Sequence, residues 1–479
     1  MSKAMQRLHG TLTRIQERAH EELTNNAALS ELVGHALLAQ SGLPFTSHAE
    51  RLSALLKACR RTRLGPTRNL LRQQLEPFLV GDLTDVGRTH QVGWEQYCGP
   101  SGELRQCRAL MTSLVLKAPR PGGEKGVLYC SFESNWMRLV AYYDARAILD
   151  DYYLVGASSW SPTDFGCMAA FAGLSRDPIF LGVSNLADME QIGIMRPVVE
   201  PLPILASDWA HPDHFSPKPQ RERTIDILMI ATWSKLKRHR LLFEALRDMP
   251  RHLRVVLVGR NAPGRTEKEV RAEAREMGVP QDLELHTNLE IWEVAALQCD
   301  AKISTIFTRR EGSCVAVAES LMADTPVAMM EEAHIGSKSY INPQTGVLLG
   351  RQHLGMQLEQ FLAEREQYTP RKWAIENISC MRTSARLNAA LRDWALRTGR
   401  PWTEDIAPLC WRYVPAYVNP ADEERLRPAV EQLLHRHGVE IKKFPGERAS
   451  LAMKDTGASP RPAEASPESP PRPLSVAAL

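Results

Sequence analysis

The sequence predicts an α/β protein with two Rossmann-like, doubly wound parallel-sheet domains and an extra helical region at the N-terminus. Buried apolar runs alternate with helical patterns over residues 106–205 and again, more clearly, over residues 223–365. Between them, residues 206–222 are rich in proline, histidine and aspartate, which is typical of an interdomain linker. A chain of 479 residues is long enough for two such domains and additional segments.

Residues 1–105 are predicted to be helical, because apolar residues such as Leu52, Leu55 and Leu56 recur at helical spacing. This region also contains a cluster of basic residues: Arg60, Arg61, Arg63, Arg68 and Arg72. We favour a solvated helix face for this cluster. Attraction to an anionic membrane surface is the alternative that stays open.

The first α/β domain is expected to have a parallel sheet. Its predicted elements are strands over residues 126–132, 153–156 and 178–183 and a helix over residues 136–149. Glu133 and Asn135 follow the first of these strands, where they could contact a second substrate. Capping of the following helix explains these two residues equally well.

The second domain has the stronger pattern. Its predicted strands cover residues 225–231, 254–259, 283–286, 301–306 and 326–330, with helices over 238–249, 266–277, 292–298 and 316–322. A ligand is expected at the carboxyl ends of these strands. Residues 366–445 are again predicted to be helical, and the composition of residues 446–479 predicts a disordered tail.

The candidate chemistry lies in a loop and helix that follow the strand over residues 301–306. Glu311 is expected in the loop and Glu319 within the helix, so the two carboxylates could hold separate parts of one elongated ligand. Three residues between them offer backbone N–H groups at the helix N-terminus: Gly312, Ser313 and Cys314. The helix dipole favours a phosphate at that position, and Gly312 has no Cβ to keep a ligand away from the backbone.

This segment resembles the E-x7-E signature of retaining glycosyltransferases of family 4, the group 1 glycosyltransferases, which have the GT-B fold. The matching residues are Glu311-Gly312, Glu319 to Ala323 and Pro326-Val327. Further similarity is found in the loop over residues 230–239, in the crossing over residues 208–217 and in a predicted hairpin over residues 345–349. In the first of these, Lys237 occupies the place of a lysine that contacts the donor diphosphate in the family.

The resemblance implies two GT-B domains that face a cleft, with a nucleotide sugar as co-substrate and no cofactor or metal ion. It implies catalytic roles for Glu311 and Lys237, with retention of configuration at the transferred sugar. Donor binding is expected from Arg238, Gly312, Ser313, Cys314 and Glu319. Thr232 and Asp324 stand where the family usually has Arg and Gly, so Arg238 or Arg240 is expected to supply the second positive charge.

The acceptor implied by the resemblance is a glycan or a lipid-linked molecule, such as a precursor of a cell-surface polysaccharide. An alternative from another class is a catalytically inactive scaffold that binds a nucleotide sugar. A nucleotide-sugar 2-epimerase shares the architecture, but it ranks lower because its acid/base carboxylates and histidine have no counterpart that we can place.

Other features exclude further functions. The net charge of +3 gives no argument for nucleic acid. Asp150-Asp151 fits a charge pair at a helix end better than a metal site, and His211 and His214 lack further ligands at metal-binding spacing. Nine scattered cysteines without a CxxC pair, a polar N-terminus and the lack of a long apolar stretch favour a cytoplasmic protein. The inner face of the membrane is a further expectation, because of the basic helical region.

Overall fold

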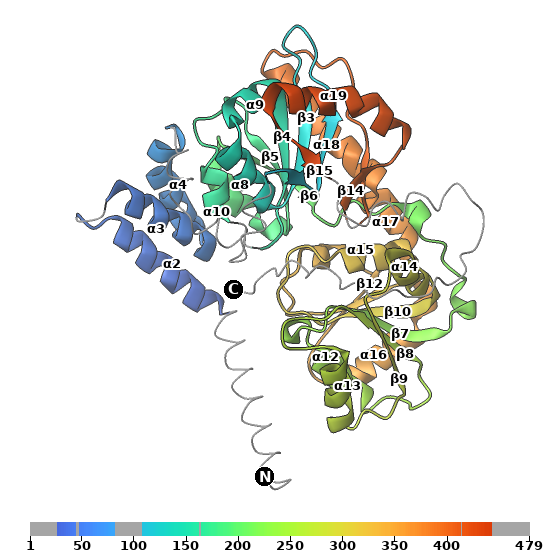
Figure 1. The fold of residues 1–479 in the computed structure, drawn as a ribbon. Coiled ribbons are helices and arrows are strands. Elements are labelled where there is room, and N and C mark those ends of the chain that lie inside the picture. Colours follow the sequence, from blue (N-terminus) through green and yellow to red (C-terminus); the bar gives the residue numbers. More distant parts are fainter. Residues whose placement is uncertain (1–25, 45–46, 82–107, 162–163, 413, 443–479) are drawn as a thin grey trace.

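The computed structural model describes residues 26–44, 47–81, 108–161, 164–412 and 414–442. It contains two α/β domains, each built on its own sheet of entirely or mainly parallel strands, with helices on both faces (Figure 1). The predicted fold class is therefore confirmed. Residues 1–25, 82–107 and 443–479, which include the predicted tail from residue 446, lie outside the described residues.

The N-terminal domain has a five-stranded sheet in the order β2-β3-β4-β5-β6, in which only the edge strand β2 is antiparallel to its neighbour. The strands are β2 (Ser113–Lys117), β3 (Gly126–Ser131), β4 (Tyr152–Ala157), β5 (Ile179–Val183) and β6 (Val199–Leu205). The sequence patterns did not predict β6, which contains Pro201 and Pro203. Proline lacks an N–H donor, so such a strand is tolerated at the edge of a sheet.

The helices of this domain are α8 (Glu133–Tyr142), α9 (Ala145–Asp151), α10 (Phe165–Ala169) and α11 (Met189–Ile192), with the 3-10 turns η1 (Leu186–Asp188) and η2 (Gly193–Met195). The single helix predicted over residues 136–149 is thus divided into α8 and α9. The division falls at Asp144, whose side chain accepts a hydrogen bond from the backbone N–H of Ala147 and caps α9.

Three helices of the N-terminal region, α2 (Ala27–Ser41), α3 (His48–Arg61) and α4 (Gly65–Leu79), pack beside the N-terminal domain (Figure 1). Leu52, Leu55 and Leu71 are fully buried in this contact. Two arginines of the basic cluster also face the domain. Arg63 pairs with Asp188 at 3.0 Å, and Arg68 pairs with Glu190.

The C-terminal domain has a six-stranded parallel sheet in the order β12-β11-β10-β7-β8-β9. Its strands are β7 (Ile225–Ile230), β8 (Val255–Gly259), β9 (Leu283–Thr287), β10 (Ala301–Ile306), β11 (Val327–Met330) and β12 (Gly346–Leu349). Residues 345–349, expected as a hairpin, instead form the parallel edge strand β12 beside β11. Since β7 and β10 are neighbours at the centre, the strand order reverses between them, and ligands bind such sheets at this switch point.

Five helices cover the two faces of this sheet: α12 (His239–Leu246), α13 (Glu267–Glu276), α14 (Ile291–Asp300), α15 (Val315–Met322) and α16 (Leu354–Ala363). Short 3-10 turns lie at η3 (Pro212–His214), η4 (Gln220–Glu222), η5 (Lys235–Lys237), η6 (Gly336–Tyr340) and η7 (Arg365–Gln367). The predicted helices of this domain all have counterparts, because its apolar periodicity is strong.

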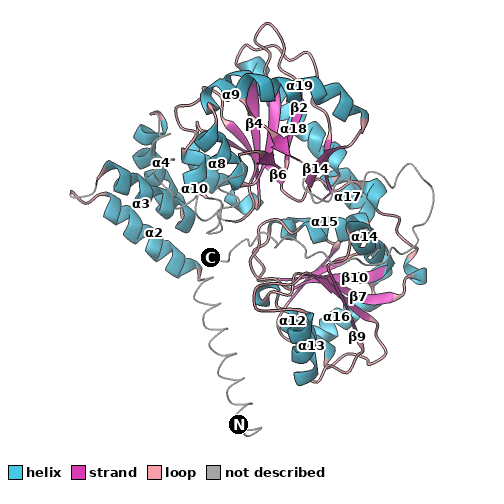
Figure 2. Ribbon diagram, viewed as in Figure 1, coloured by secondary structure: helices cyan, strands magenta, loops and turns pink. Residues whose placement is uncertain are grey.

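The chain then returns to the N-terminal domain. Helix α17 (Pro370–Ile378) packs on α15, whereas α18 (Cys380–Arg397) lies against β6 and the buried face of the first sheet (Figure 2). At the break between them, the Cys380 N–H donates to the Ala210 carbonyl at 3.0 Å, so the return crossing runs beside the linker. The two domains are thus joined by two neighbouring crossings.

The remaining elements complete the N-terminal domain. They are the hairpin β13 (Leu409–Arg412) and β14 (Val414–Tyr417), helix α19 (Ala421–His437), and strand β15 (Ile441–Lys442), which pairs with β1 (Leu110–Met111). This hairpin lies within the region that was predicted to be helical. None of the helices in the described part of the chain is both long and apolar enough to cross a membrane.

Candidate functional site

Lys237 and Glu311 meet at the switch point of the C-terminal sheet. Lys237 ends the 3-10 turn η5 in the loop after β7, and Glu311 lies in the loop after β10. Because β7 and β10 are adjacent and parallel, their carboxyl ends bring these loops together, although the two residues are 74 positions apart. The Lys237 Nζ donates to the Glu311 Oε1 at 2.5 Å.

The ion pair is partly buried, with side-chain exposures of 18% for Lys237 and 20% for Glu311. Burial acts to lower the pKa of Lys237, but the charge of Glu311, the interaction with Cys314 and the hydrogen bond to Glu311 together outweigh it, so that the pKa is raised and the ammonium stays charged. The second carboxylate oxygen, Glu311 Oε2, is buried and accepts no hydrogen bond from the described residues. Its capacity to accept a hydrogen bond is therefore unused within the described residues.

Arg238 connects the loops around this pair. It has a left-handed backbone conformation (φ 56°, ψ 40°), which turns the chain from η5 into α12. Its guanidinium donates to the Phe307 carbonyl at 3.4 Å and to Glu332 at 3.3 Å. These contacts hold the loop after β7 to the loops after β10 and β11.

The N-terminus of α15 lies beside the ion pair. The helix begins at Val315, and its N-cap residue, Cys314, makes no side-chain cap. The backbone N–H groups of Gly312, Ser313 and Cys314 donate to no acceptor among the described residues. Burial raises the pKa of the Cys314 thiol to about 12, so it is neutral at physiological pH and only its backbone can serve an anion. An open helix N-terminus next to a lysine suits a phosphate.

Gly312 has a packing role that the sequence did not reveal. A Cβ at this position would lie 2.4 Å from the Ser159 carbonyl oxygen, in the loop after β4 of the N-terminal domain. A Cβ at Gly336 would likewise lie 1.8 Å from the Ser184 carbonyl oxygen, after β5. The carboxyl ends of the two sheets thus face each other and are in direct backbone contact at two glycines, which no larger residue permits without a shift.

Ser313 also contacts the other part of the molecule. Its Oγ accepts a hydrogen bond from the Ser207 N–H at 3.2 Å and bonds to the Ser207 hydroxyl, which in turn lies 2.6 Å from the Tyr340 hydroxyl. The Tyr340 hydroxyl donates to Asp208, and burial raises the pKa of Asp208 to about 6. This network joins the start of the linker to the loop after β10, so the Ser313 side chain is turned toward the linker, and the Ser313 N–H group has no acceptor among the described residues.

Glu319 is not in contact with Lys237 or Glu311. It lies on α15, half-buried, on the side that faces Gln298 of α14. Burial raises its pKa to about 7, a shift that Gln298 partly opposes. The structure therefore brings Glu311, Lys237 and the N–H groups of residues 312–314 together and leaves Glu319 apart from them.

Asp324 illustrates how a departure from the family pattern is accommodated. It has φ 56°, the left-handed region that glycine adopts without strain. Aspartate is one of the few other residues that enter this region readily. Its carboxylate accepts a hydrogen bond from the Arg371 N–H at 3.2 Å, which ties the turn after α15 to α17.

Glu133 and Asn135, which the sequence suggested as possible contacts of a second substrate, form hydrogen bonds within the protein. Glu133 accepts hydrogen bonds from the Ser159 N–H at 3.1 Å and hydroxyl at 2.6 Å, and Asn135 bonds to the backbone of Met111 and Ser131. Both residues hold loops in place.

The residues considered as metal ligands also interact with other side chains of the protein. Asp151 pairs with Arg436 and His437 of α19. The rings of His211 and His214 stack at 4.8 Å. Within the described residues, no group of acidic, histidine and cysteine side chains is suited to a metal ion.

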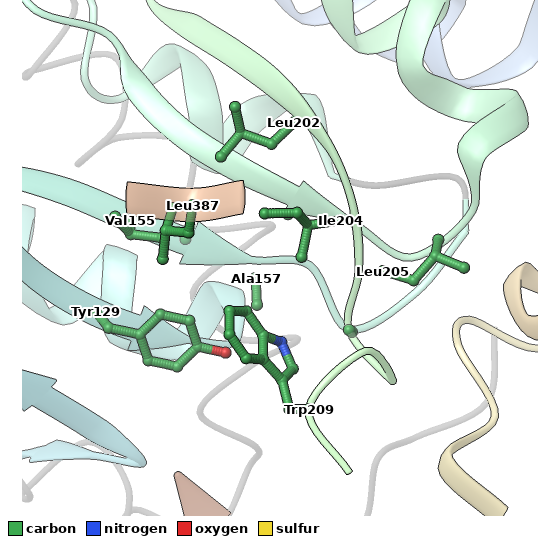
Figure 3. A pocket seen from close by; sticks show the side chains of 11 residues that line it. Tyr129, Val155, Ala157, Leu202, Ile204, Leu205, Trp209 and Leu387 are labelled. Carbon is green, nitrogen blue, oxygen red and sulfur yellow. The ribbon is translucent and has the colours of Figure 1, made fainter. Parts of the chain in front are cut away.

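A small cavity lies elsewhere, in the core of the N-terminal domain. Trp209, Tyr129, Ile204 and Leu387 are among its mainly apolar lining residues (Figure 3). The cavity is no larger than a water molecule, so it cannot hold a sugar, and neither Lys237 nor Glu311 lines it.

Neither a family model nor a curated protein sequence matches this chain. Solved structures do show similarity. A mutant of S. aureus TarM, bound to Fondaparinux, alpha-GlcNAc-glycerol and UDP, matches with 14% identity, a TM-score of 0.39 and coverage of 50% of each chain. Anabaena HepE bound to UDP matches with 12% identity and a TM-score of 0.46, over 56% of this chain and 78% of that protein.

A third similar structure is the pneumococcal O-GlcNAc transferase GtfA in complex with UDP and GlcNAc. It shares 12% identity with a TM-score of 0.38, over 54% of this chain and 55% of that protein. The similarity thus spans only about half the length of TarM and of GtfA. The functional conclusion depends on the residues of the site.

Proposed function

We propose that this protein is a glycosyltransferase that uses a nucleotide-sugar donor bound to the C-terminal domain. The observation that supports it most directly is the meeting of Lys237 and Glu311 across the β7–β10 switch point, beside the open N-terminus of α15. A positive charge, unpaired amide N–H groups and an unpaired carboxylate oxygen suit the diphosphate and the hydroxyl groups of an activated sugar.

In the proposed reaction the bond between the anomeric carbon and the diphosphate oxygen breaks, and the electron pair leaves with the diphosphate. The N–H groups of residues 312–314 and the Lys237 ammonium stabilise the negative charge that develops there. Glu311 Oε2 accepts a hydrogen bond from a sugar hydroxyl and orients the ring. The acceptor hydroxyl forms the new bond to the anomeric carbon, and the departing phosphate takes its proton.

Several finer statements belong to this proposal because of the resemblance to family 4. They are membership of that family, retention of configuration, charge stabilisation without a metal ion, and contact between Glu319 and the ribose. A glycan or lipid-linked acceptor, a role in polysaccharide synthesis and a cytoplasmic location, with the inner face of the membrane as a further option, are proposed on the same ground.

A binding and turnover experiment tests the function. A thermal-shift screen with UDP, GDP, ADP and their sugars identifies the donor, because a ligand that binds only the folded state raises the unfolding temperature. The matching nucleotide sugar is then incubated with wild type, Glu311→Ala and the control Glu359→Ala, an exposed glutamate on α16. We expect donor hydrolysis or transfer by wild type and the control, and none by Glu311→Ala. Binding without turnover by wild type would instead identify a catalytically inactive scaffold.

A further inference from the structure

Five basic residues from three separate segments meet where the N-terminal helices, the N-terminal domain and the donor-side loops come together. We call them the junction cluster: Arg61, Arg63, Arg309, Arg310 and Lys338. Arg61 and Arg63 lie at the end of α3, Arg309 and Arg310 in the loop after β10, and Lys338 in η6. Only the tertiary structure unites them.

Direct contacts join the junction cluster to the loop that contains Glu311. Arg63 pairs with Asp188 at 3.0 Å, and Asp188 accepts a hydrogen bond from the Ser161 hydroxyl. The Ser161 Oγ lies 3.1 Å from His334 Nε2, and the His334 carbonyl accepts a hydrogen bond from the Glu311 N–H at 3.1 Å. The strand-like pairing of Arg310 with His334 continues this contact. The junction cluster therefore borders the proposed sugar site on its N-terminal-domain side.

Two charges of the junction cluster, those of Arg61 and Arg310, form no ion pair with a carboxylate of the described residues. Asp188 is the carboxylate among the charges that act most strongly on Arg310 and His334, and it already pairs with Arg63. The Arg310 guanidinium makes no hydrogen bond or ion pair with a described residue, and its Nε is buried. Burial lowers the pKa of Arg310, and the charges of Arg63, Arg61 and Arg309 lower it further.

The positive charges of the junction cluster repel one another, and a bound anion reduces this repulsion. Guanidinium groups present planar pairs of donors that match the oxygens of a phosphate. The donor diphosphate has its own partners in Lys237 and the N–H groups of α15. The anion at the junction cluster is therefore a second one, on the side where the N-terminal domain approaches.

We propose that the junction cluster binds a phosphate group of the acceptor, so that the acceptor is a phosphate-bearing molecule. Its assignment to the acceptor rests on the proposed glycosyltransferase function. The phosphate comes either from a soluble phosphorylated sugar or polyol or from a lipid headgroup. In both cases the guanidinium of Arg310 binds the phosphate and orients the acceptor. Arg310 directly precedes Glu311, whose carboxylate is proposed to hold the donor sugar.

Calorimetric titration with inorganic pyrophosphate at low salt tests the proposal. In a Lys237→Ala background, which weakens the donor subsite, pyrophosphate binding is expected to persist, and addition of Arg310→Gln should weaken it by at least about tenfold. Arg310→Lys should give an intermediate affinity, because it keeps the charge and loses the paired donors. Arg72→Gln, on the exposed face of α4, is the matched control and should bind as its parent does.

Equal pyrophosphate affinity with and without Arg310→Gln would overturn the proposal. If Lys237→Ala alone leaves nucleoside diphosphate affinity unchanged while Arg310→Gln still weakens pyrophosphate binding, the donor assignment fails and the phosphate site stands. Glycerol phosphate and vesicles of phosphatidylglycerol distinguish the two sources, because only the one that resembles the acceptor should show binding that depends on Arg310.

Thermal unfolding separates a binding role from a structural role. Arg310→Gln removes one positive charge from a group of positive charges, so the unfolding temperature of this variant should be unchanged or higher than that of wild type. Such a result is typical of binding sites, where residues needed for function reduce stability. A clear loss of stability in this variant, without an effect on pyrophosphate, would mean that Arg310 serves the fold, and it would refute the proposal.

Discussion

Glu311→Gln should have opposite effects on nucleotide binding and on sugar transfer. In the structure the Glu311 carboxylate lies 2.5 Å from the Lys237 ammonium. A diphosphate that binds to Lys237 must compete with this carboxylate and is repelled by its charge. Glutamine keeps the size of the side chain and removes the charge. We therefore expect the variant to bind the free nucleoside diphosphate more tightly and yet to transfer sugar much more slowly.

The magnitude follows from Coulomb's law. A carboxylate about 5 Å from a phosphate oxygen repels it by roughly 3 kcal/mol at an effective dielectric constant of about 20. About one fifth of each side chain is exposed, 20% for Glu311 and 18% for Lys237, so water and salt screen this repulsion. We expect a net gain of about 1 kcal/mol, which is about a fivefold decrease in Kd.

Isothermal titration calorimetry with the nucleoside diphosphate that stabilises the protein most measures this effect. The titration is made at low salt and again at high salt, where the gain should shrink because the interaction is screened. If Glu311→Gln weakens nucleoside diphosphate binding, then Glu311 supports the phosphate site directly, and the assignment of this carboxylate to the sugar is refuted.

Three further predictions follow from the same geometry. Lys237→Ala should weaken nucleoside diphosphate binding by about tenfold or more, because a charge-assisted hydrogen bond is lost. Gly312→Ala should lower the unfolding temperature, because its Cβ would lie 2.4 Å from the Ser159 carbonyl oxygen. Glu319→Gln should reduce discrimination between a nucleoside diphosphate and its 2′-deoxy analogue. Because the folded-state pKa of Glu319 is raised to about 7 from 4.5, this group's contribution to stability is present below pH 4.5 and is lost as the pH rises toward 7.

Each of these predictions has its own control. For Lys237→Ala, equal affinity in calorimetry would remove Lys237 from the diphosphate site. For Gly312→Ala, the control is Gly42→Ala, where a Cβ meets only an ordinary contact at 3.6 Å, and equal unfolding temperatures for the two variants would contradict the packing argument. For Glu319→Gln, wild type should lose up to about 3 kcal/mol relative to the variant between pH 4.5 and 7, measured by denaturant unfolding. A pH-independent difference would show that Glu319 does not titrate there.

Much of the fold could be predicted because its signals are local in the chain. The strands and helices of the C-terminal domain have the buried apolar runs and helical periodicity that parallel α/β units require. The same reasoning placed Glu311 after a strand and the N–H groups of residues 312–314 at a helix N-terminus, as the structure has them. It missed β6, because Pro201 and Pro203 hide the strand pattern, and it missed the β13–β14 hairpin.

By itself, then, the sequence determined the order of the elements and which residues stand at strand ends, since these depend on neighbours a few positions apart. Only the tertiary structure decided which strand ends meet. The Lys237–Glu311 pair depends on the β7–β10 pairing, the requirement for Gly312 depends on the backbone of Ser159, and the junction cluster gathers arginines from α3 and the β10 loop. These three features have the same physical reason. Contacts between residues far apart in the chain arise when whole helices and strands pack together, and no local spacing in the sequence encodes them.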